Sequence, residues 1–99
     1  MNDQLADVSY WLTLQIAQRE PPVNLNQIYQ GSIELDYLYQ TLTSKVQHYW
    51  WINYDVELSP ILINNAFFRA LSFLHARNIE YSKLRCSKET AWVKELLHL

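Results

Sequence analysis

The chain contains a single glycine, Gly31, among its 99 residues, and this scarcity constrains the fold more than any other feature. Glycine supplies most of the positive-φ backbone conformations that tight turns need, so a β-sandwich or another loop-rich architecture would lack turn residues. Hydrophobic residues make up 49% of the chain and charged residues 18%, a composition that excludes an intrinsically disordered protein. We therefore predict one helical domain over residues 1–99.

Four segments carry the hydrophobic period or the boundary residues of α-helices. Ser32, which follows Gly31, is placed to cap the second segment, and Ser59 before Pro60 is placed to cap the third. The predicted helices cover residues 3–19, 32–49, 60–77 and 87–99. Together they predict an all-α fold with about four helices in an irregular bundle.

Residues 50–58 depart from the helical period. Trp50, Ile52 and Tyr54 occupy every second position there, which is the rhythm of a half-buried strand. A lone strand is unstable, and residues 79–86 are the only candidate partner in the sequence. The alternative fold is therefore α+β, with two short strands near 50–58 and 79–86, whereas an extended or helical connection at 50–58 agrees with the all-α prediction.

An aromatic window at residues 48–54, His-Tyr-Trp-Trp-Ile-Asn-Tyr, is the strongest candidate for a binding surface. Tryptophan and tyrosine carry much of the energy of cores and protein interfaces, and a small core cannot easily hide every ring of such a window. Tyr49 and Trp50 are expected to complete the core stripe of the second helix, and Tyr54 is expected on the inward face. Trp51 is left off the core in either geometry.

Five large apolar residues fall outside the predicted core stripes. A continuing helix would place Trp51 on the face that holds Tyr37 and Ile33, and the third helix carries a second such set. We predict these five as partner-binding residues: Trp51, Tyr37, Ile33, Ile61 and Phe68. Burial against a neighbouring helix is the alternative for Ile61 and Phe68, and a secondary cluster under a loop is the alternative for the others. If both sets are exposed, a homodimer is the simplest way to cover them.

The formal net charge of −2 hides an uneven distribution. Residues 1–44 hold five acidic residues and one arginine, a balance of −4, and the remainder holds seven basic and five acidic residues, a balance of +2. The basic second half allows an alternative function, a nucleic-acid-associated helical domain that resembles a helix-turn-helix. Its contact residues would be Arg69, Arg77, Lys83, Arg85 and Lys88. An acidic isoelectric point near 5.8 argues against this alternative.

Other chemistry finds little support in the residue pattern. The three histidines and the single Cys86 have no spacing typical of a metal site, and one glycine cannot form a phosphate-binding loop. We therefore predict no cofactor, no metal and no enzymatic activity. The unpaired cysteine, the acidic N-terminus and the lack of a membrane-length apolar run indicate a cytoplasmic protein without a membrane partner.

The sequence thus predicts a small non-enzymatic protein that binds another protein through an aromatic surface. It would act as a homodimeric adaptor or as a stoichiometric inhibitor or immunity-type partner. The acidic first half would help to orient it toward a basic surface.

Overall fold

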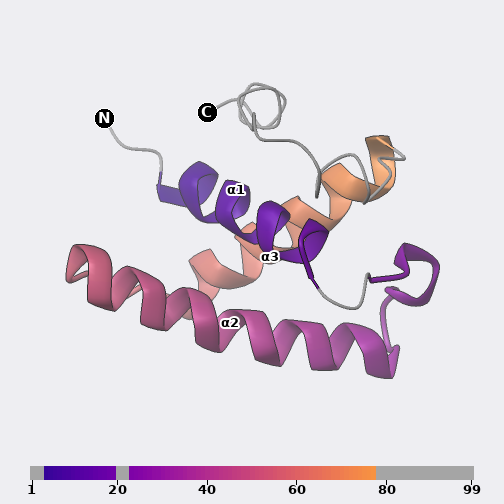
Figure 1. Ribbon diagram of the computed structural model, residues 1–99, viewed down its shortest axis with the longest axis horizontal. Coiled ribbons are helices and arrows are strands. Elements are labelled where there is room, and N and C mark those ends of the chain that lie inside the picture. Colours follow the sequence, from indigo (N-terminus) through magenta and orange to yellow (C-terminus); the bar gives the residue numbers. More distant parts are fainter. Residues whose placement is uncertain (1–3, 20–22, 78–99) are drawn as a thin grey trace.

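The computed structural model describes residues 4–19 and 23–77, and over these residues the protein is all-α, as predicted. Three α-helices are present there, α1 (Gln4–Ala17), α2 (Ile33–Tyr54) and α3 (Pro60–Arg77), with a short 3-10 turn, η1 (Leu25–Gln27), between the first two. In Figure 1, α2 runs along one side of the molecule, and α1 and α3 lie above it. The predicted helix at 87–99 and the candidate strand at 79–86 lie outside the described residues.

The predicted caps start the helices at the expected positions. Ser32 has an extended backbone, and its hydroxyl oxygen accepts a hydrogen bond from the Leu35 N–H at 3.1 Å. Ser59 accepts from the Leu62 N–H at 3.1 Å, ahead of a first helical residue, Pro60, that has no N–H of its own. Each cap satisfies a donor that the helix cannot pair internally, so the local sequence sets both starting points.

Gly31 occupies the left-handed region with φ of 88° directly before the Ser32 cap. A Cβ at this position would meet no atom within 4 Å. Glycine is therefore needed here for its backbone conformation and not for lack of space. The one glycine of the chain therefore serves the turn that leads into α2.

We expect Gly31→Ala to lower the free energy of unfolding by about 1–2 kcal/mol, because an L-residue with a Cβ is strained at this φ. Gly31→Asn should lower the free energy of unfolding by less, since asparagine tolerates the left-handed region better than alanine. Urea unfolding of the three proteins measures this order. Equal stability of the alanine variant would show that the turn takes another conformation.

The α+β alternative is wrong at residues 50–58, because α2 continues as a helix to Tyr54. Trp50 lies four residues after Val46 and shares its buried face, so the helical period persists through the segment that also reads as an alternating pattern. The helix ends at Asp55, which adopts φ of 53° and ψ of 40°. The Asp55 and Val56 N–H groups then donate to the Trp51 and Trp50 carbonyls at 3.1 and 3.4 Å, which satisfies the end of the helix.

Helix α1 packs chiefly against α3 and buries small side chains as well as large ones. Ser9 and Thr13 are fully buried, and their hydroxyls donate to the Leu5 and Ser9 carbonyls of the same helix at 2.6 and 2.7 Å. These two polar groups need no partner on another helix. Helix α3 also buries two small side chains, Ala66 and Ala70, and small side chains of this kind allow helices to approach closely.

The larger core side chains fill the space around this contact. Phe67 of α3 is fully buried and meets the Tyr39 ring of α2 edge-to-face at a centroid distance of 5.1 Å. The Gln47 side-chain amide donates to the Leu58 carbonyl at 3.2 Å and ties α2 to the connection before α3. Other buried apolar side chains include Val8, Leu12, Ile16, Leu38, Leu42, Val46, Ile63 and Leu74.

We expect Ser9→Leu to lower the free energy of unfolding by about 1–3 kcal/mol, because a larger side chain would force α1 away from its neighbour. Ser9→Ala removes only a hydroxyl that is satisfied within its own helix and should change stability by less than about 1 kcal/mol. Chemical denaturation of both variants tests the pair. A leucine variant as stable as the parent protein would contradict the close packing of α1.

Candidate functional site

All five predicted partner-binding residues are exposed. Between 45% and 82% of each side chain is accessible, and the set is Trp51, Tyr37, Ile33, Ile61 and Phe68. Tyr29, Ile52 and Tyr54 are also large, apolar and exposed. Among the described helices, none buries Ile61 and Phe68, although the Phe68 ring rests edge-on against Phe67 at 5.5 Å.

The three predicted residues of α2 share one face of the helix but do not form one patch. Ile33 and Trp51 are 18 positions apart, which is a whole number of helical turns and about 27 Å along the axis. The polar residues Gln40 and Ser44 lie exposed on that face between them. At the N-terminal end, the Arg19 guanidinium lies over the Tyr37 ring at 5.7 Å, so part of that ring is already engaged.

At the C-terminal end of α2, two adjacent tryptophans differ in solvent exposure. Trp50 is only 7% exposed and belongs to the core, whereas Trp51 is 55% exposed and is followed by exposed Ile52 and Tyr54. The prediction that Trp50 completes the core stripe is confirmed. The prediction that Tyr54 faces inward is wrong, because Tyr54 is the last residue of α2 and is 56% exposed, although its ring still contacts Trp50 one turn earlier.

We expect Trp50→Ala to lower the free energy of unfolding by about 3–5 kcal/mol, because it leaves a large cavity in the core. Trp51→Ala should cost less than about 1 kcal/mol, because its side chain is mostly in water. The two variants remove the same chemical group one residue apart, and thermal or urea unfolding compares them directly. Similar losses for both would mean that Trp51 is a core residue.

Only two of the five residues predicted to contact nucleic acid in the alternative function lie among the described residues. Arg69 is half-buried on α3, and Arg77 is the last residue of that helix. Lys83, Arg85 and Lys88 lie outside the described residues.

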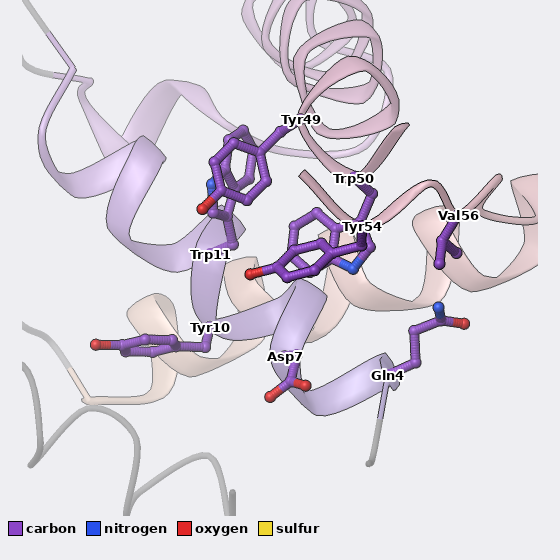
Figure 2. A pocket seen from close by; sticks show the side chains of 8 residues that line it. All are labelled: Gln4, Asp7, Tyr10, Trp11, Tyr49, Trp50, Tyr54 and Val56. Carbon is purple, nitrogen blue, oxygen red and sulfur yellow. The ribbon is translucent and has the colours of Figure 1, made fainter. Parts of the chain in front are cut away.

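A pocket opens where the end of α2 meets α1, and Trp51 is not among the residues that line it (Figure 2). Its volume is about 420 Å³, within the range of small-molecule binding sites. The lining side chains come from α1, from the last turns of α2 and from the connection that follows: Gln4, Asp7, Tyr10, Trp11, Tyr49, Trp50, Tyr54 and Val56. Five of the eight are aromatic, so most of the wall consists of ring surface.

Helical spacing explains how each element contributes. On α1, Asp7 and Trp11 are four residues apart and therefore stand on the same face. On α2, Trp50 and Tyr54 have the same spacing. Figure 2 shows the two sets facing each other, with Asp7 on α1 below the rings of the α2 end.

The rings contact one another across the junction. Trp11 lies 5.3 Å from Tyr49 and meets Trp50 edge-on at 6.1 Å, and Tyr54 lies 5.5 Å from Trp50. These centroid distances are typical of favourable aromatic pairs. The contacts hold α1 against the end of α2 and fix the shape of the pocket.

The polar groups of the pocket are tyrosine hydroxyls, the Gln4 amide and one carboxylate, Asp7. A side-chain hydrogen bond with Tyr49, supported by the electrostatic influence of Tyr49, by desolvation and by the charge of Asp7, raises the pKa of Tyr54 above its ordinary value. Tyr54 therefore stays protonated at neutral pH. Among the described residues that line the pocket, Asp7 carries the one full charge, and it is negative.

The pocket was not predicted from the sequence. In the sequence, Asp7 is one of the five acidic residues of the first half, and Tyr54 is expected on the inward core face and not in the wall of a pocket. The available signals were the two i, i+4 pairs, Asp7 with Trp11 and Trp50 with Tyr54, but nothing in the sequence indicates that they meet.

Residues 4–19 and 23–77 offer neither a metal site nor a membrane span. No group of three or more histidine, cysteine, aspartate or glutamate side chains converges there in a way that could hold a metal ion. None of the helices formed by these residues is both long enough and apolar enough to cross a membrane.

A comparison of the chain with protein-family models, with curated proteins and with solved structures finds no match.

Proposed function

We propose that this chain is a non-enzymatic protein-binding module that acts in the cytoplasm. Its contact surface is the C-terminal end of α2, formed by Trp51, Ile52 and Tyr54. The observation that carries the proposal is the 55% exposure of Trp51 beside two further exposed apolar side chains on a regular helix. Tryptophan and tyrosine are the residues most enriched among those that dominate binding energy.

A helix is a suitable platform for such a surface. The backbone hydrogen bonds of α2 and its capped C-terminus hold the three side chains in fixed relative positions before a partner arrives. Less conformational entropy is then lost on binding than with a surface loop. The buried neighbour Trp50 anchors this end of the helix to the core.

The charges near this surface favour a partner with a basic face. Asp55 and Glu57 directly follow α2, and both are exposed, as is Asp7. These acids would attract and orient a basic surface, whereas two copies of the chain meeting here would bring like charges together. They would also repel nucleic-acid phosphates. A different protein is therefore favoured over both a second copy and a nucleic acid, with inhibition of that protein as the simplest outcome of binding.

Affinity capture with the tagged full-length chain from its native cells, followed by quantitative mass spectrometry, tests the proposal. We expect Trp51→Ala to reduce recovery of a specific partner by tenfold or more, as for a binding hot spot. Tyr29→Ala removes an exposed aromatic side chain that lies ahead of α2, outside the predicted partner-binding set, and serves as the matched control. Its recovery should stay close to that of the parent chain.

Light scattering on the purified chain tests whether it forms a homodimer. A monomer is expected, and a dimer that Trp51→Ala dissociates would identify a second copy as the partner. The proposal fails if capture and oligomeric state are both unaffected by Trp51→Ala.

A further inference from the structure

The pocket between α1 and the end of α2 combines aromatic surface with a single negative charge. Trp11, Tyr49, Trp50 and Tyr54 supply the ring surface, and Asp7 supplies the charge. Aromatic rings attract cations through the negative potential of their faces, and this attraction is strongest for tryptophan. A carboxylate at the same site adds a direct Coulomb attraction.

We propose that this pocket binds an organic cation of the alkylammonium class, held against the rings with Asp7 as its counter-charge. The proposal that this cation is a lysine side chain of the protein partner, methylated or unmodified, rests on the proposed function. The binding of alkylammonium groups as such stands on the pocket alone.

The charges on the described part of the pocket wall disfavour an anionic ligand. No lysine, arginine or histidine stands among the residues of 4–19 and 23–77 that line it, so an anion would meet Asp7 there without a compensating cation. The N-terminus of α1 carries a partial positive charge of roughly half an elementary charge, but Asp7 in the first turn carries a full negative one. The C-terminal end of α2 adds a partial negative charge on the opposite wall.

The shape also suits an alkylammonium group better than a hydrated metal ion. The wall is largely ring surface and offers one carboxylate, whereas hard metal ions need several oxygen ligands. A methylated ammonium ion has an outer shell of C–H groups that can lie on aromatic faces without losing its charge, and the alkyl stem next to an unmethylated ammonium can do the same. With a volume of about 420 Å³, the pocket has room for part of an alkyl stem as well as the head group.

Tyr54 connects this pocket to the proposed protein-binding surface. Its ring contacts Trp50 at 5.5 Å and Tyr49 at 6.1 Å, yet 56% of the side chain is exposed. A partner resting on Trp51 and Ile52 would thus lie beside the mouth of the pocket. A basic side chain of that partner could enter it.

The test titrates the ¹⁵N-labelled full-length chain with two probes of nearly identical shape, choline and its neutral isostere 3,3-dimethylbutan-1-ol, and follows the tryptophan indole N–H signals. We expect choline to bind about tenfold or more tightly than the isostere, because only choline gains the cation–π and Coulomb attraction. Equal affinity for the two probes would overturn the proposal. So would the absence of saturable choline binding up to about 100 mM.

Variants distinguish the contribution of the Asp7 charge to choline binding from that of the aromatic rings. Asp7→Asn should weaken choline binding about five- to tenfold while leaving the isostere unaffected. Tyr54→Leu should weaken it by a similar factor, and Tyr54→Phe, which keeps the ring, should restore most of the affinity. A choline affinity that none of these changes alters would place the binding elsewhere and contradict the assignment.

A short peptide with one trimethyllysine distinguishes the two sources of the cation. Tighter binding of the peptide than of choline supports a partner side chain, and tighter binding of choline assigns the pocket to a free small cation. Trp51→Ala should leave choline affinity within about twofold, because Trp51 does not line the pocket. If choline binds but no partner is captured, the proposed function is rejected and the pocket proposal stands. If a partner is captured but choline does not bind, the pocket proposal is rejected and the proposed function stands.

Discussion

The structure depends on how α1 is held. Its buried serine and threonine satisfy their hydroxyls on carbonyls of their own helix, so small polar side chains can stand in the core without partners elsewhere. This lets α1 pack closely on α3. With that face occupied, the face of α1 that carries Asp7 and Trp11 is left to meet the end of α2, where the aromatic rings fix its position.

The last two turns of α2 then give one short stretch of sequence three different environments. Trp50 enters the core, Trp51 faces solvent, and Tyr54 lines a pocket while remaining partly exposed. The difference between Trp50 and Trp51 follows from a rotation of about 100° per residue along a regular helix. Tyr54 lies on the Trp50 side and is exposed because the helix ends there. The left-handed Asp55 ends the helix immediately afterwards, so the separation between buried and exposed rings falls at the edge of the domain surface.

The starts of the helices could be predicted from the sequence because they depend on local chemistry. Ser32 and Ser59 cap the helices that follow them, and the single glycine lies where a positive φ is needed. The exposure of Trp51 could also be predicted, since both a helix and a strand place it away from the core. The end of α2 was less certain, because over five residues an alternating pattern and a helical one can contain the same apolar positions.

The pocket could not be predicted, because it arises from residues about 40 positions apart that tertiary packing brings together. The sequence pattern predicts only that Asp7 and Trp11 share one face of a helix and that Tyr54 continues the core face of α2. Only the packing of α1 on α3 determines that these side chains meet.

The central claim is that α2 remains helical to Tyr54 and packs there against Trp11. Nuclear Overhauser effects between aromatic side chains test it most directly. We expect cross-peaks from Trp11 ring protons to both Tyr49 and Trp50, and from Trp50 to Tyr54 across one helical turn. Backbone cross-peaks typical of an extended strand at residues 50–54, together with no contact between Trp11 and this segment, would contradict the account.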